Sequence, residues 1–138
     1  MAEHLTADAY NEWLRGKAQG IVRRDSERGG TYSVSAAKAA IHAAIVACEG
    51  VDYWTGEQLD WSLLGNYNSE ESGRRGASYK RARAMQPTID HRESLPELDF
   101  VICAWRTNDA KHDMTHEELL EFCRRVLAHA GVMDVRRQ

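Results

Sequence analysis

The stretch from Thr88 to His112 constrains the fold of this chain most, because its residue pattern changes there from strand-like to helix-like. Thr88 to Asp90 is short, follows a proline and contains β-branched residues, which is typical of a strand. Asp99 to Trp105 is rich in apolar and aromatic residues and predicts a second strand. Beyond it the spacing is helical, so Asn108 and His112 project from one face of a helix. The stretch therefore predicts a strand, a turn, a second strand and a helix.

The polar residues along this stretch resemble the ββα-metal finger of the HNH (His-Me finger) endonucleases. In that family an Asp-His or His-His pair ends the first strand, a middle Asn or equivalent precedes the second strand, and a final Asn or His opens the helix. Asp90-His91, Asp99 and Asn108 fall in that order, and the segment from Asn108 to Lys111 is similar to the family's Asn-x-x-Lys ending. The resemblance covers about residues 86 to 115. The chain diverges in lacking the paired Cys-x-x-Cys motifs that often bind zinc beside this finger.

The resemblance implies a site that hydrolyses phosphodiester bonds in DNA. By resemblance, His91 is the general base. Imidazole suits that role because it exchanges protons near neutral pH. Asp99 would orient His91 by accepting a hydrogen bond. Asp90 and Asn108, together with His112, would bind one divalent cation that stabilises the charge on the phosphorane and on the departing 3′ oxygen.

The ligand set indicates which cation the site would take. Oxygen atoms from Asp90 and Asn108 favour Mg²⁺ or Mn²⁺, whereas recruitment of His112 would shift the preference toward Zn²⁺ or Ni²⁺. We expect Mg²⁺. Arg106 or Lys111 would contact the scissile phosphate through charge-assisted hydrogen bonds.

The densest group of basic residues directly precedes the Asp-His pair. It contains Arg74, Arg75, Lys80, Arg81 and Arg83, with Tyr79 among them. In one interpretation the basic residues bind the phosphate backbone of DNA and the tyrosine stacks on a base. In the other, the group is an exposed helix face without a ligand.

An alternative to the nuclease is a catalytically inactive, HNH-like module that binds nucleic acid or protein and has a regulatory role. Asp90, Asp99 and Asn108 would then be turn and cap residues, because Asp and Asn are favoured at both places. Trp105 and Arg106 would belong to an interaction surface. The sequence leaves both hypotheses open.

The N-terminal part, residues 1 to 50, is expected to be helical. Apolar residues recur at spacings of three and four over residues 7 to 28 and again over residues 35 to 48, and each pattern predicts a helix. The first helix ends in the charged run from Arg23 to Arg28. That run is either a solvated helix end or a rim that faces phosphate.

Residues 51 to 131 are expected to form the HNH-like part. Aromatic residues around Thr55 and Gly56 indicate a turn flanked by extended pieces, with apolar packing in place of a zinc site. We expect a loop over residues 66 to 77 and a short helix over 78 to 85. Thr115 and Glu118 form a capping-box motif that starts a C-terminal helix. That helix should bury its apolar residues, namely Leu119, Leu120, Phe122, Cys123, Val126 and Leu127.

The chain has 138 residues, which suits a single α+β domain with N-terminal helices, a ββα-metal finger-like core, a C-terminal helix and a tail over 132 to 138. The formal net charge of −3 argues against a protein that coats DNA, but a local basic patch can suffice for a nuclease. Three widely spaced cysteines fit a reducing cytoplasm. We expect a cytoplasmic protein without a membrane partner, and a homo-oligomer stays open.

Overall fold

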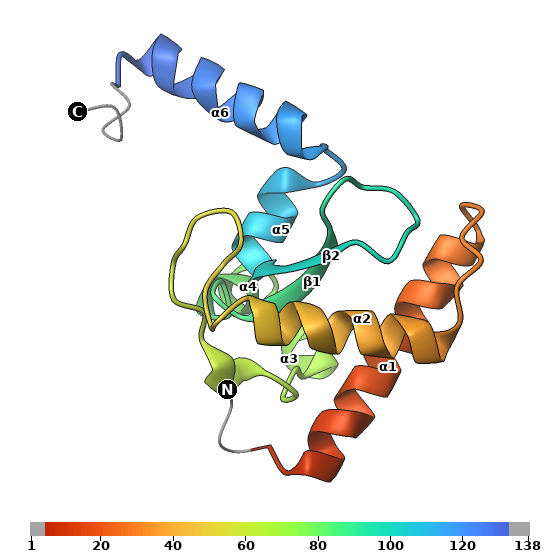
Figure 1. The fold of residues 1–138 in the computed structure, drawn as a ribbon. Coiled ribbons are helices and arrows are strands. Elements are labelled where there is room, and N and C mark those ends of the chain that lie inside the picture. Colours follow the sequence, from red (N-terminus) through yellow and green to blue (C-terminus); the bar gives the residue numbers. More distant parts are fainter. Residues whose placement is uncertain (1–4, 133–138) are drawn as a thin grey trace.

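The structure is a computed structural model that describes residues 5–132. Its N-terminal part consists of α1 (Ala7–Ser26) and α2 (Val34–Ala47), which pack against each other (Figure 1). Both helices start at a hydroxyl cap: Thr6 accepts from the amide of Ala9 and Ser33 accepts from that of Ala36, each at 3.1 Å. The two helices predicted for this part are confirmed, with ends shifted by one or two residues.

A turn after α2 connects the helical part to the strands. Asp52 is buried there, and its Oδ1 accepts hydrogen bonds from the amides of Trp54 at 2.7 Å and Thr55 at 2.9 Å. Its Oδ2 accepts from the amide of Ala104 at 2.7 Å, which ties the turn to the end of the second strand. The predicted turn at residues 55 and 56 is confirmed. The chain then forms the short helix η1 (Trp61–Leu63).

Two short helices follow. They are α3 (Ser69–Arg75) and α4 (Ala77–Ala82), separated by Gly76. The first lies where a loop was predicted, and the second corresponds to the short helix predicted over residues 78 to 85. The prediction of a loop over residues 66 to 77 is wrong because the ends of α3 are well stabilised. Asn68 caps its N-terminus. Acidic residues occupy the first turn and basic residues the last turn, where each charge interacts favourably with the helix dipole.

The strands β1 (Pro87–His91) and β2 (Phe100–Ala104) form a two-stranded antiparallel sheet, and α5 (Trp105–Lys111) follows directly. Pro87 pairs with Ala104, and His91 pairs with Phe100. The predicted order of strand, strand and helix is confirmed, and the fold is α+β. In Figure 1 α2 crosses beside the sheet, and both β2 and α2 contribute to the core. The buried apolar residues of the core come from α1, α2, the segment around η1, and β2: Leu14, Ala18, Ile21, Ala37, Ile41, Ile45, Leu59, Trp61, Leu64, Ile102 and Ala104.

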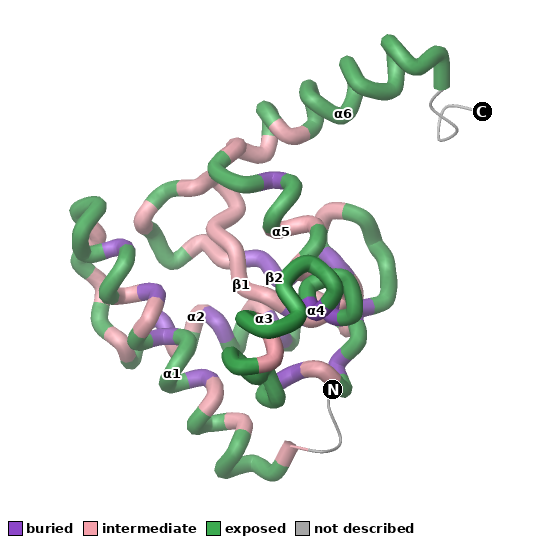
Figure 2. Tube along the Cα trace, turned by 180° about the vertical axis from the view of Figure 1, so that it is seen from behind, coloured by how far each residue is buried: buried purple, intermediate pink, exposed green. Residues whose placement is uncertain are grey.

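The last helix, α6 (His116–Ala130), begins and ends as the sequence predicts. The Thr115–Glu118 capping box is present, and Gly131 ends the helix in a left-handed conformation with φ 75°. Its predicted burial is wrong: no residue of α6 is buried, and Cys123 is exposed. Figures 1 and 2 show the reason: beyond its first turn, α6 projects away from the rest of the described fold. The predicted tail from residue 133 onward lies outside the described residues.

Within residues 5–132, no helix combines the length and the apolar character that crossing a membrane requires.

Candidate functional site

A cavity of 320 Å³ lies where the end of α1 meets β1, β2 and α5. Three residues predicted for the site line it together: Asp90 and His91 from the end of β1, and Asn108 from α5. Charged residues from the end of α1 complete the polar part of the wall: Arg24, Asp25 and Arg28. The apolar part of the wall comes from Ile21, Ile89 and Phe100. The cavity therefore joins the predicted finger to a helix that lies far away in the sequence.

His91 is held in place by a carboxylate from α1. Its Nε2 lies 2.8 Å from Oδ2 of Asp25, a buried residue to which the Tyr32 hydroxyl also donates a hydrogen bond. The imidazole packs against the Phe100 ring, with the centroids 5.1 Å apart. Removal from water and the hydrogen bond to Asp25 both raise the pKa of Tyr32, so its hydroxyl stays a donor.

The contact with Asp25 decides which nitrogen of His91 carries the lone pair. A carboxylate accepts a hydrogen bond, so Nε2 is the protonated nitrogen and Nδ1 is the basic one. Nδ1 is buried and has no hydrogen-bond partner. Buried polar atoms without a partner are rare in folded proteins and often mark functional positions. The acceptor nitrogen of the ring is therefore Nδ1, which is buried in this structure.

Asp99 does not provide the carboxylate expected beside His91. It forms an ion pair with Arg92, whose Nε and Nη2 lie 3.1 Å and 2.9 Å from its Oδ2. The strand register explains the difference. His91 lies opposite Phe100, so the next pair outward is Arg92 with Asp99, and their side chains meet across the two strands. Asp25 takes the position that was assigned to Asp99.

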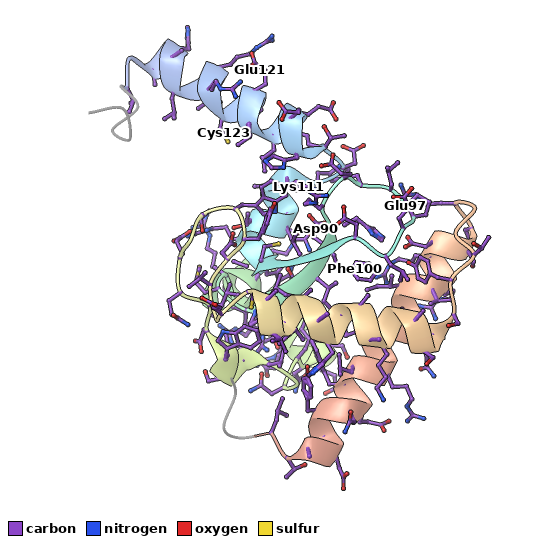
Figure 3. The ribbon with its side chains drawn as sticks, viewed as in Figure 1. Asp90, Glu97, Phe100, Lys111, Glu121 and Cys123 are labelled. Carbon is purple, nitrogen blue, oxygen red and sulfur yellow. The ribbon has the colours of Figure 1, made fainter. Side chains whose placement is uncertain are left out.

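Asp90 forms an ion pair with Lys111, whose side chain is completely buried. The Lys111 Nζ lies 3.0 Å from Asp90 Oδ2, although no directed hydrogen bond joins these two atoms. It also donates to the His91 carbonyl at 3.1 Å and to Ser94 Oγ at 3.2 Å, and it lies over the Trp54 ring. Figure 3 shows Asp90 and Lys111 near each other beside α5. Lys111 is inaccessible to DNA, so the prediction that it contacts the scissile phosphate is wrong.

The burial of Asp90 affects its ionisation. Desolvation raises the pKa of this carboxyl, and the ammonium of Lys111 opposes the rise by favouring the carboxylate. The pKa of Asp90 is raised on balance, so desolvation outweighs the stabilisation of the carboxylate by Lys111.

Asn108 reaches back from α5 to β1. Its Nδ2 donates to Thr88 Oγ1 at 3.2 Å and to the Ile89 carbonyl at 3.4 Å, which orients the amide at the cavity. The amide of His112 closes a helical turn on the Asn108 carbonyl at 3.0 Å, but the His112 side chain does not share the cavity with Asn108 as predicted. The helix ends at Lys111, and His112 adopts a left-handed conformation with φ 53°. Its side chain is 82% exposed and pairs with Asp113 outside the cavity.

The oxygen donors at the cavity fit a hydrated Mg²⁺ or Mn²⁺ ion. Mg²⁺ is usually bound through one or two carboxylates and retains several of its waters. Asp90 Oδ2 is buried beside the Lys111 ammonium, which leaves the other carboxylate oxygen of Asp90 and the Asn108 amide as donors for an ion. Across the described part of the chain, no three His, Cys, Asp or Glu residues gather as a metal-binding group, so an ion here would depend mainly on these two residues and water.

The predicted nucleic-acid-binding residues outside the cavity lie on or near α3, α4 and α5. Most have acidic or aromatic neighbours: Arg74 pairs with Glu71, Arg75 lies over Tyr79, Lys80 pairs with Asp109 at 2.7 Å, and Arg106 binds Glu57 at 2.8 Å. Lys80, Arg81, Arg106 and Asp109 line one shallow surface pocket. Tyr79 is buried, with its hydroxyl accepting from the Asn68 amide, so it is not available to stack on a base.

The contact of Asp25, at the end of α1, with His91 was not predicted from the sequence. The signal was present: the buried positions Leu14, Ala18 and Ile21 continue at the same spacing to Asp25, which places a carboxylate on the buried stripe of the helix. Such a residue requires a polar partner in the interior, and His91 is that partner. Arg24 and Arg28 line the same cavity, and whether this charged run faces phosphate stays a prediction.

Comparison of this chain with protein families, with characterised proteins and with solved structures finds no match. The function of this protein is therefore inferred from the cavity and its residues.

Proposed function

We propose that this protein is a metal-dependent endonuclease of the HNH type that hydrolyses phosphodiester bonds in DNA. The observation that carries the proposal is one cavity shared by a carboxylate-bound histidine, His91, and two oxygen donors, Asp90 and Asn108. The strand–strand–helix order around them agrees with the resemblance drawn from the sequence.

The residues of the cavity divide the work of hydrolysis. His91 accepts a proton from water at Nδ1, and the water oxygen forms a bond to phosphorus. The bond from phosphorus to the 3′ oxygen breaks, and this leaving oxygen takes a proton from solvent. Asp25 holds the imidazole through Nε2 and stabilises the positive charge that the ring gains. A base without its oriented carboxylate would be less effective.

Two further tasks fall to neighbouring groups. Asp90 and Asn108 would hold Mg²⁺ or Mn²⁺, which when bound supplies positive charge to the phosphorane and to the leaving oxygen. Arg24 and Arg28 line the same cavity and would bind the non-bridging phosphate oxygens, a task for which buried Lys111 is unsuited.

One observation favours the second candidate function, an inactive HNH-like module that binds DNA or protein. The Lys111 ammonium already neutralises Asp90, so a divalent cation would have to share this carboxylate with a buried positive charge. In this alternative the exposed basic residues of α3 and α4, Arg74, Arg75, Lys80 and Arg81, would provide the affinity for DNA.

A nicking assay tests the proposal. Supercoiled plasmid is incubated with wild-type protein and Mg²⁺ or Mn²⁺, with EDTA in a parallel reaction. We expect nicking that EDTA abolishes and that His91→Ala reduces by roughly 100-fold or more, the usual range for loss of a general base. His129→Ala, which removes an exposed histidine at the far end of α6, is the matched control and should nick like wild type.

The outcome separates the two functions. Equal nicking by wild type and folded His91→Ala would mean that the activity is a contaminant, and the nuclease would be rejected. An inactive wild type that still retards DNA in a gel, with retardation lost on Arg74→Gln and Arg75→Gln, would support the binding module.

A further inference from the structure

The helix α6 has one apolar face that nothing in the described chain covers. Apolar residues recur along it at spacings of three and four, and they lie on one side of the helix. Leu120, Phe122, Val126 and Leu127 are between 38% and 55% exposed. A contiguous exposed apolar face on a strongly amphipathic helix is typical of an interaction surface.

The rest of the fold determines where this face lies. Thr115 caps the helix, and His116 makes edge contacts with Trp54 at 5.1 Å and Tyr53 at 6.4 Å between ring centroids. These contacts attach the first turn of α6 to the turn after α2. Beyond this first turn α6 projects outward, so its apolar face is open to a second molecule (Figure 2).

The charges beside the apolar face are arranged in two halves. Glu117 and Glu118 lie in the first turn. Arg124 and Arg125 lie two turns further along the helix, where both also pair with Glu121 of the same helix at 2.8 Å. At 3.6 residues per turn, Glu117 and Arg124 flank one edge of the apolar face, and Glu118 and Arg125 flank the other. Each edge therefore carries a negative group followed by a positive one.

We propose that α6 is a homodimerisation helix that pairs in antiparallel orientation with α6 of a second copy of this chain. A twofold axis near residues 121 and 122 brings the apolar faces together around Phe122. The same axis brings Glu118 of one copy opposite Arg125 of the other, and Glu117 opposite Arg124. The surface is thus complementary to itself in apolar character and in charge, as an interface with twofold symmetry requires.

The charge pattern distinguishes this arrangement from a parallel pair. In a parallel pair the acidic halves would lie together and the basic halves would lie together, so like charges would repel at both edges. A 15-residue helix is about 22 Å long, and a contact of that length is at the small end of specific interfaces. We therefore expect a dimer that dissociates on dilution.

The test uses the full chain and two charge-reversed variants. The first carries Glu117→Lys and Glu118→Lys, and the second carries Arg124→Glu and Arg125→Glu. Sedimentation velocity over a hundredfold range of protein concentration should give a dimer for wild type and monomers for each variant alone. An equimolar mixture of the two variants should again give a dimer, because opposite charges then meet at both edges.

Two controls exclude trivial explanations. Asp8→Lys with Glu12→Lys reverses two exposed acidic groups on α1 and should leave the dimer intact, which separates a local effect from a change in net charge. Phe122→Asp should give a monomer through loss of the apolar contact. Circular dichroism reports whether α6 stays helical in each variant.

Three results would overturn the proposal. A wild type that is monomeric throughout would show that α6 does not bind a second copy. Dimers that persist in both charge-reversed variants would place the interface elsewhere or in the parallel orientation. A mixture that stays monomeric would reject the antiparallel alignment.

Discussion

Replacement of Lys111 by Met should destabilise the protein strongly, because it removes the partner of a buried carboxylate. The Lys111 side chain is 0% exposed and that of Asp90 is 12% exposed. The ammonium also donates to the His91 carbonyl and to Ser94 Oγ. Loss of one partner from a buried ion pair costs about 3–5 kcal/mol. Two hydrogen bonds from a charged donor, at roughly 1.5–3 kcal/mol each, lead to a similar figure.

The loss should depend on pH, with a sign that follows from Asp90. Burial raises the pKa of Asp90, and Lys111 opposes this rise. Without Lys111 the pKa of Asp90 in the folded state rises further above its unfolded value. The protonated acid is then the favoured folded form. The stability lost in Lys111→Met is therefore small below the pKa of Asp90 in the unfolded state, and it grows as the pH rises through the pKa of Asp90 in the folded state. Lys111→Met should therefore be less harmful in acid than at neutral pH.

Urea unfolding followed by circular dichroism measures this effect. With an m-value of about 2 kcal/mol/M, a loss of about 4 kcal/mol lowers the unfolding midpoint by roughly 2 M. The matched double variant, Asp90→Asn with Lys111→Met, should recover part of the loss because no unpaired charge stays buried. A double-mutant cycle in which the two single losses add to within about 0.5 kcal/mol would refute the buried ion pair.

Three other predictions concern Asp25, the cysteines Cys103 and Cys123, and the proposed metal ligand Asn108. Asp25→Asn should lower plasmid nicking by about 10–100-fold while DNA retardation is unchanged, since a group that orients a functional side chain acts on the chemistry and not on DNA affinity; equal loss of both would point to misfolding. Burial raises the pKa of the Cys103 thiol to about 12, so a thiol reagent at pH 8 should modify exposed Cys123 rapidly and Cys103 only after unfolding, and mass spectrometry of the labelled peptides checks this. Asn108→Ala should weaken Mn²⁺ binding in a calorimetric titration, whereas His112→Ala should not; the reverse result would restore the ligand set drawn from the sequence.

Much of the local structure was readable from the sequence because its signals act over a few residues. Hydroxyl caps at Thr6 and Thr115 mark the starts of the first and last helices, and Gly131 marks the end of the last one. The β-branched and aromatic residues of β1 and β2 identify the strands. The order of strand, strand and helix then follows, and with it the places of Asp90, His91 and Asn108 at the cavity.

Tertiary packing decided which groups surround those residues. Asp25 and His91 are 66 positions apart, and they meet only because α1 packs beside the sheet. Lys111 belongs to the motif that suggested a phosphate contact, yet its position on α5 turns it inward toward Asp90. Local pattern cannot reveal such pairings, because each depends on how separate elements are placed around a common core.

The last helix shows most clearly which features the sequence determines and which the tertiary structure decides. Its residue spacing determines that α6 is amphipathic and that one face favours removal from water, since burial of apolar area lowers the free energy wherever the cover comes from. The sequence alone predicted that the cover would be the rest of this chain. The tertiary structure leaves the face exposed, because beyond the contact of His116 with Trp54 the helix projects away from the core. The hydrophobic pattern thus determines which surface favours removal from water, and the path of the chain decides whether the chain itself covers that surface.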